Sequence, residues 1–128
     1  MTVRIVRLGT ERSKNEGLRI GTVRRPPRGV PKSEFVSQNW YDVWFPNLAP
    51  SQELMKLGQA VETDQEWHAF EKKYRSEMAD RDRSRVLDLL AALSHSANFS
   101  VGCYCEKESR CHRSVLRQLL VERGADVR

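Results

Sequence analysis

Three cysteines and a histidine lie close together near the end of the chain, within residues 101–113. They are Cys103, Cys105, Cys111 and His112, and Arg113 follows directly. A thiolate is a nucleophile and a metal ligand, an imidazole transfers protons near neutral pH, and a guanidinium binds anions. These residue types at this spacing predict a functional site in the segment.

The first interpretation of this segment is a reactive thiol. A helix that begins near Cys111 would present unpaired N–H groups and the positive end of its dipole, and both favour a thiolate or a bound anion. His112 and Arg113 would assist it. We therefore predict that Cys111, His112 and Arg113 are the catalytic residues.

Two other interpretations of the same segment stay open. Zn²⁺ accepts three cysteines and one histidine, but the spacing C-x-C-x₅-C-H is not that of paired CxxC knuckles. On a helix, the neighbours Cys111 and His112 would also diverge by about 100°. Alternatively, Cys103 and Cys105 are small buried side chains that only pack. We predict no cofactor and assign no residue to a metal.

A basic segment at the start of the chain predicts an anionic ligand. The net charge of the whole chain is +5. Residues 1–32 hold nine Lys or Arg and only two Glu, so this first quarter of the chain has a net charge of +7. The loop that contains Pro26, Pro27 and Pro31 is stiffened by its prolines, which lowers the entropic cost of presenting cations. The predicted anion-binding residues are Arg19, Arg24, Arg28 and Lys32.

Strands and a helix are expected to position these groups. Residues 3–8 and 18–23 alternate apolar and polar side chains as strands do, and residues 98–105 form the last strand. A helix then runs to Arg123, with Gly124 after its end. A further short strand is expected at 39–45. A functional loop between a strand and a helix is typical of α/β proteins.

Helices are expected in the middle of the chain. One begins near Ser51, and a second begins at a capping box formed by Thr63 and Glu66. A third begins at Asp80 or Asp82. The predicted fold class is α/β: a single compact domain over residues 1–128, with a small, mainly parallel sheet flanked by helices, three-layer and Rossmann-like in outline.

Composition limits the class of protein. Hydrophobic residues make up 39% and charged residues 30%, which is typical of a globular domain. No apolar run reaches the roughly eighteen residues that cross a bilayer. An odd number of clustered cysteines does not predict a secreted disulfide framework. We expect a cytoplasmic protein without a membrane partner.

Five separated segments resemble the domain of unknown function 488 family, particularly its YeaO-like branch. They are Gly17-Leu18-Arg19-Ile20, Arg24 with Pro27 to Lys32, Trp44 with Leu48 to Leu54, Trp67 to Met78, and Gly102 to Cys105 with Cys111 to Leu116. The resemblance implies a compact α/β fold and a cytoplasmic microbial protein, but no established activity. Where relatives often have an aspartate before the arginine, this chain has Val23.

Two functions from different classes follow. The first is a small enzyme that acts on a phosphorylated or otherwise anionic substrate, with the basic loop beside the Cys-His-Arg segment. The second is a non-catalytic nucleic-acid-binding module that uses the basic quarter and stacks bases on aromatic side chains. The candidate aromatics are Trp40, Tyr41, Trp44 and Phe45.

Overall fold

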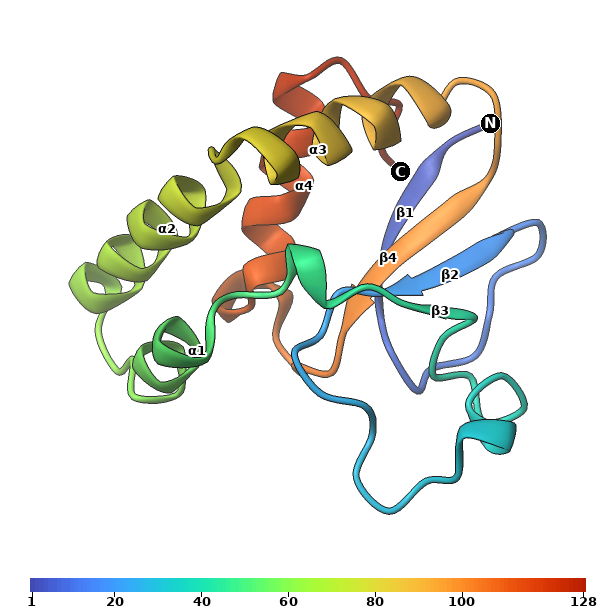
Figure 1. Ribbon diagram of the computed structural model, residues 1–128, viewed down its shortest axis with the longest axis horizontal. Coiled ribbons are helices and arrows are strands. Elements are labelled where there is room, and N and C mark those ends of the chain that lie inside the picture. The colour runs from blue at the N-terminus through green and yellow to red at the C-terminus, as the bar shows by residue number, and fades with distance from the viewer.

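A four-stranded parallel sheet lies at the centre of the protein. The computed structural model describes residues 1–128 (Figure 1). The strands are β1 (Val3–Arg7), β2 (Leu18–Gly21), β3 (Val43–Trp44) and β4 (Phe99–Cys103). Their order across the sheet is β1-β4-β2-β3, and every neighbouring pair is parallel. All four strands therefore end at the same edge.

The alternation of side chains sets which face of the sheet meets the core. In β1, Val3 and Ile5 are buried on one face, whereas Arg4 and Val6 are half-buried on the other. Strand β4 is buried along its whole length, because β1 and β2 flank it. The last strand in the sequence thus becomes a central strand of the sheet.

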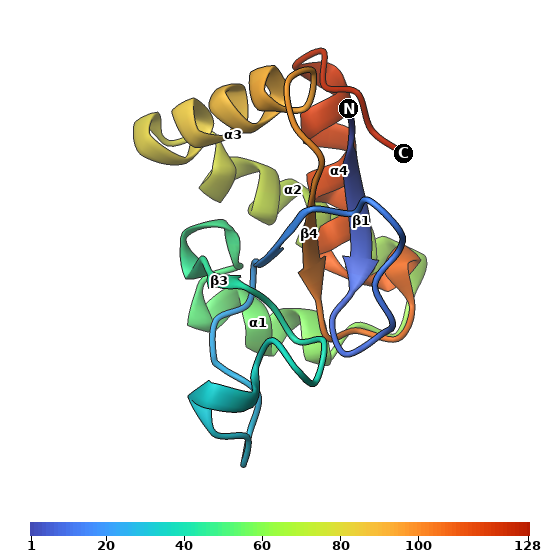
Figure 2. The same cartoon turned by 90° about the vertical axis from the view of Figure 1, so that its right-hand side faces the viewer.

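Four helices pack together beside the sheet. They are α1 (Gln52–Gln59), α2 (Asp64–Met78), α3 (Arg81–Leu93) and α4 (His112–Glu122). Helix α4 packs against β1 and β4, and both α2 and α3 pack against α4 (Figure 2). The start of α4 is therefore held directly beside the end of β4.

The main core lies between the sheet and these helices. Trp67, Phe70, Tyr74 and Met78, at spacings of three and four residues, form an apolar stripe along α2 and are all buried. They meet Val115, Leu116, Leu119 and Leu120 of α4, together with the inward side chains of the strands. Burying large apolar side chains supplies most of the stabilisation of such a domain.

The other face of the sheet is covered by loops. An added Cβ at Gly21 would lie 2.4 Å from the ring of Tyr41, so only glycine permits this close approach. The side chain of Arg19 also points into these loops, where it donates to the carbonyl oxygens of Thr10 and Asn39. The two long loops of the N-terminal third are thereby fixed to the sheet.

The predicted element boundaries are close to those observed. The capping box of Thr63 and Glu66 is present, and the side chain of Asp80 caps α3. Gly124 follows α4 with a φ of 82°. The fold class is confirmed as a compact α/β domain with an all-parallel sheet and four helices. The predicted three-layer outline is not found, because all four helices share one core and loops cover the other face of the sheet.

One predicted strand is much shorter in the structure. Within residues 39–45, only Val43–Trp44 is a strand. Asn39 has a φ of 62°, in the left-handed region, which interrupts extended backbone at the start of that segment. None of the helices has both the length and the apolar composition needed to cross a membrane.

Candidate functional site

A groove lies at the edge where the strands end. Because the strands are parallel, the residues that follow β1, β2 and β4 all reach this edge, as ligand sites in parallel sheets commonly do. The groove has a volume of about 1190 Å³. Its lining residues come from the segments after these strands, from Trp40 and from helix α1, with His112 at the start of α4.

The charged residues that line the groove are all cationic. They are Arg7, Arg24, Arg25, Arg28 and Lys56, and no aspartate or glutamate lines the groove. Cations gathered in a concave site raise the local positive potential, because the walls around them have a low dielectric. The groove is therefore suited to an anion.

Hydrogen bonds hold the basic loop in place beside the groove. Arg24 donates to the carbonyl oxygens of Ala49 and Pro50, at 3.0–3.2 Å, immediately before helix α1. The hydroxyl of Tyr104 donates to the carbonyl oxygen of Arg25 at 2.9 Å. The loop after β2 is thus tied both to the α1 wall and to the segment after β4.

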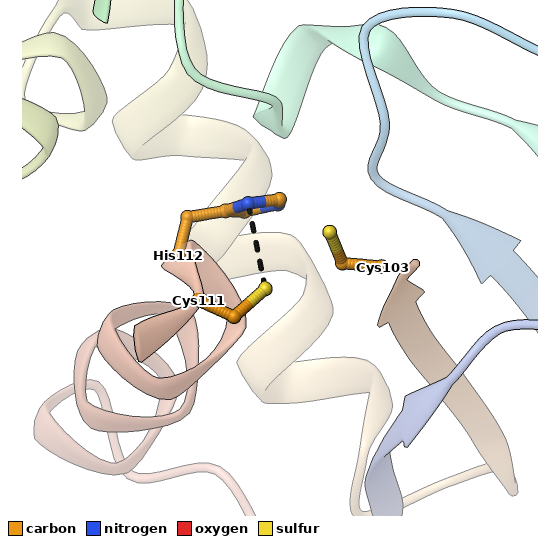
Figure 3. Close-up of side chains that lie close together, drawn as sticks. All are labelled: Cys103, Cys111 and His112. Atoms are coloured by element: carbon orange, nitrogen blue, oxygen red, sulfur yellow. Dashed lines mark hydrogen bonds between the residues drawn. The ribbon is translucent and has the colours of Figure 1, made fainter. Parts of the chain in front are cut away.

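Three thiols and one imidazole form a cluster on the floor of the groove. Possible ligand atoms of Cys103, Cys111 and His112 all lie within 4.8 Å of one another (Figure 3). The Sγ atoms of Cys103 and Cys105 are 3.6 Å apart. We call these four residues, Cys103, Cys105, Cys111 and His112, the Cys–His cluster.

The expectation that Cys111 and His112 diverge was wrong. Cys111 is the N-cap of α4, and its φ of −124° and ψ of 146° are extended rather than helical. The angle of about 100° between successive helical side chains therefore does not apply to this pair. Cys111 Sγ lies 3.9 Å from His112 Nδ1.

His112 is held in one orientation by a backbone hydrogen bond. Its Nε2 donates to the carbonyl oxygen of Thr22 at 2.8 Å, which leaves Nδ1 as the acceptor facing Cys111. The ring is buried and lies 5.4 Å from the ring of Tyr74. This burial lowers the pKa of His112 to about 4, so the imidazole is neutral at pH 7.

The three thiols differ in exposure. Cys103 and Cys111 are buried, and Cys105 is exposed. Hydrogen bonds donated by Cys103 and Cys111 lower the pKa of Cys105. The pKa values of Cys103 and Cys111 are raised, because their thiols donate to neighbouring sulfurs. The first proton lost from the cluster therefore leaves from Cys105.

Arg113 is buried next to the cluster without a carboxylate partner. Its side chain is 5% exposed and donates one hydrogen bond, to the carbonyl oxygen of Cys105 at 2.9 Å. Its Nε has no partner at all. A buried guanidinium without an anion is costly, so this charge indicates negative charge at the cluster.

Comparison with known proteins identifies the family. A family model described as the Active DUF488-N3 subclade matches residues 3–124. The chain belongs to the DUF488 family. The family predicted from the sequence is confirmed, and the YeaO-like branch stays a prediction. No curated protein and no solved structure matched this DUF488 domain significantly.

The structure separates the predicted anion-binding residues of this DUF488 domain into two pairs. Arg24 and Arg28 line the groove. Arg19 is fully buried and pairs with Glu16 at 2.7 Å, and Lys32 lies in a short exposed helix (Lys32–Glu34) outside the groove lining. Arg19 thus holds the loops to the sheet instead of facing a ligand.

The predicted catalytic residues are close to the groove, but only one lines it. His112 is a lining residue, whereas Cys111 and Arg113 lie behind the surface. From the sequence, Cys105 was considered as a zinc ligand or as a packing residue, but not as a catalytic residue, and Arg25 and Lys56 were not singled out. Alternation along the strand had placed Cys105 on the same face as Cys103. Nothing in the sequence indicated that Lys56 on α1 would face the same groove.

Proposed function

We propose that this DUF488 domain is an enzyme that binds a phosphorylated or otherwise anionic substrate in the groove. The Cys–His cluster on the floor supplies the reacting groups. The observation that carries the proposal is one groove with five cations, no carboxylate, and three thiols with an imidazole at its base.

The substrate anion is assigned to the exposed cations of the basic loop. Arg25 and Arg28 are exposed and line the groove, and neither pairs with a carboxylate. The guanidinium fork matches the oxygens of phosphate or carboxylate groups, and such charge-assisted hydrogen bonds are among the strongest in proteins. Arg24 is already bonded to two carbonyl oxygens, so its main part is to shape the site.

The substrate is larger than a bare phosphate. The groove volume of about 1190 Å³ lies above the range of roughly 300–1,000 Å³ that is usual for small-molecule sites. Apolar side chains, among them Trp40 and Met55, line it together with the cations. An anion with an attached apolar or ring-containing part fits this lining.

The reacting groups are assigned by their position. Cys105 is the exposed thiol of the cluster, so a bound substrate meets it first. His112 presents Nδ1 towards the thiols, because its other nitrogen is bonded to Thr22. The N-terminus of α4 and Arg113 add positive charge beside any negative charge that forms.

Anion binding tests the proposal directly. Inorganic pyrophosphate is titrated into the wild-type protein and the variants Arg25→Gln and Arg28→Gln, with binding measured by calorimetry. Each variant should weaken binding by about tenfold or more, as expected for a lost charge-assisted hydrogen bond. The control is Lys32→Gln, which removes a nearby cation outside the groove lining and should leave the affinity unchanged.

The nucleic-acid-binding module is the alternative, because Trp40 stands among the arginines of the groove. Tyr41, another aromatic considered for stacking, is buried. If pyrophosphate fails to bind while a single-stranded oligonucleotide binds with a steep salt dependence, the enzyme proposal is lost and the module is favoured. If Lys32→Gln weakened pyrophosphate binding as much as Arg25→Gln and Arg28→Gln do, the assignment of the binding site to the groove would also be contradicted.

A further inference from the structure

We infer that Cys103, Cys105, Cys111 and His112 bind one Zn²⁺ ion on the floor of the groove. This inference does not require an anionic substrate, so it goes beyond the proposed function. With the ion bound, Cys105 and His112 Nδ1 are ligands, so they are free reacting groups only in the metal-free protein. The inference rests on the distances among Cys103, Cys111 and His112, on the contact of Cys105 with Cys103, on the hydrogen bond that orients the imidazole, and on the buried charge beside them.

The distances between the donor atoms fit a tetrahedral site. Zn–S bonds of about 2.3 Å and Zn–N bonds of about 2.0 Å place two sulfurs about 3.8 Å apart, and a sulfur and a nitrogen about 3.5 Å apart. The sulfurs of Cys103 and Cys105 are 3.6 Å apart, and Cys111 Sγ is 3.9 Å from His112 Nδ1. Cys103, Cys111 and His112 already have possible ligand atoms within 4.8 Å of one another. Cys105 is not one of these three, and its Sγ contacts Cys103 Sγ, so its side chain must rotate to complete the four-ligand site.

The sequence around the cluster places three of the four donors on two rigid elements, and Cys105 lies in the loop that follows β4. Cys103 ends β4, Cys111 caps α4, and His112 is the first residue of α4 (Figure 3). Because α4 packs against β4, the two elements hold their donors in a fixed relation. The extended backbone of Cys111 lets this residue and its neighbour share one ion.

The hydrogen bond of His112 is the kind that supports a metal ligand. A metal-bound imidazole usually donates its other N–H to a carbonyl or carboxylate oxygen, which fixes the ring and its tautomer. Nε2 of His112 makes this bond to the carbonyl oxygen of Thr22 at 2.8 Å. Nδ1 is then the nitrogen that can bind a metal ion, and it faces Cys111 Sγ.

The buried positive charge of Arg113 fits a cluster that has bound zinc. Three thiolates and Zn²⁺ carry a net charge of −1. Arg113 is buried beside Cys105, has no carboxylate partner and keeps an unpartnered Nε. A negatively charged zinc–thiolate cluster gives this guanidinium the counter-charge that the protein residues do not supply.

The donor set selects the metal. Thiolate and imidazole ligands are soft or intermediate donors, whereas Mg²⁺ and Ca²⁺ require oxygen ligands. Three sulfurs and one nitrogen in a tetrahedral arrangement are typical of Zn²⁺. Since Cys105 is exposed to the groove, it is the ligand most open to replacement.

The first test is the metal content of the purified protein. The wild-type chain, produced with zinc in the medium and purified without chelator, should contain about one Zn²⁺ per chain. Cys111→Ser and His112→Gln should each lose most of this zinc. The control His68→Gln removes an exposed histidine of α2 that lies outside the cluster and should keep it.

A second test uses only the wild-type chain, so it does not depend on whether variants fold. Co²⁺ is added to the metal-free, reduced protein, and the absorption spectrum is recorded. Thiolate-to-metal charge-transfer bands, strong tetrahedral d–d bands and protection of all three cysteines from alkylation are expected at one equivalent. Absence of both zinc in the purified protein and these cobalt bands would overturn the inference.

The two proposals fail separately. Pyrophosphate binding to the metal-free protein tests only the role of the cations of the groove. Cobalt binding in the absence of pyrophosphate tests only the metal site at the Cys–His cluster. A protein that binds pyrophosphate but gives no cobalt spectrum keeps the proposed function and loses the zinc site.

Discussion

Glu16 and Arg19 form an ion pair that is closed off from solvent. The Glu16 carboxylate accepts hydrogen bonds from Arg19, from the hydroxyl of Ser100 and from the N–H of Ser13. Burial by itself would raise the pKa of Glu16, but these bonds lower it to about 2. The carboxylate therefore stays charged in the folded protein down to low pH.

This pair predicts a specific loss of stability in acid. Because the pKa of Glu16 is lower in the folded protein than in the unfolded chain, its stabilisation is complete above about pH 5 and is lost as the pH falls towards 2. Glu16→Gln should lower the free energy of unfolding at pH 7 by about 3 kcal/mol, since it leaves the Arg19 charge buried and unpaired. The free energy of unfolding, measured with urea, should differ less between the wild-type protein and Glu16→Gln at pH 3 than at pH 7.

The matched control for this pair is Glu11→Gln, a change at an exposed residue of the same loop. It should change the free energy of unfolding by less than about 0.5 kcal/mol at either pH. A Glu16→Gln variant that is as stable as Glu11→Gln at pH 7 would contradict the assignment of Arg19 to the interior.

Individual residues show where sequence reasoning reached its limit. The charge of Arg19 suggested a ligand-binding role, but charge does not indicate which arginine is buried with a carboxylate three residues away. Glu16 and Arg19 meet because the chain turns at Gly17, whose φ is 77°. The Cys–His cluster was located correctly as a segment, but its geometry depends on one non-helical residue, Cys111.

At the scale of elements, helix α1 depends on its cap. The hydroxyl of Ser51 accepts from the N–H of Leu54, and Glu77 of α2 accepts from both the hydroxyl and the N–H of Ser51. Gln52, Met55, Lys56 and Gln59 of this helix line the groove. The cap therefore joins one wall of the groove to α2.

Removing this cap should destabilise the domain. Ser51→Ala should lower the free energy of unfolding by about 1–2 kcal/mol, because the cap bond is lost and the Glu77 carboxylate loses a donor. Ser33→Ala, in the short exposed helix Lys32–Glu34, is the control and should have little effect. Chemical unfolding of both variants measures the difference, and equal stability would contradict this account of α1.

The elements themselves were the most predictable part of the molecule. Apolar spacing and capping residues are local signals, so α2 and α3 began where their caps predicted. The order β1-β4-β2-β3 is a non-local property, because it pairs residues 3–7 with 99–103. The basic loop was expected beside the Cys-His-Arg segment, because both follow strand ends, and the two do line one groove. The position of α1 at the same groove follows from the order of the strands and could not be predicted from local patterns.

At the scale of the whole molecule, positive charge and thiol chemistry meet at one edge of the sheet. The chain carries a net charge of +5, and four of the five groove cations belong to its first 32 residues. The thiols belong to the last 26 residues. The parallel pairing of β2 with β4 brings the two ends of the sequence to one groove.

The most direct test of this convergence is the alkylation rate of Cys105 in metal-free, reduced protein. Iodoacetamide is applied with and without pyrophosphate at matched ionic strength, and mass spectrometry of the cysteine peptides locates the label. Cys105 should react first, because it is the exposed thiol, and pyrophosphate should slow its labelling severalfold. Arg28→Gln should remove the protection. If pyrophosphate binds to saturation and the rate of Cys105 labelling does not change, the claim that the anion and the Cys105 thiol share one site is contradicted.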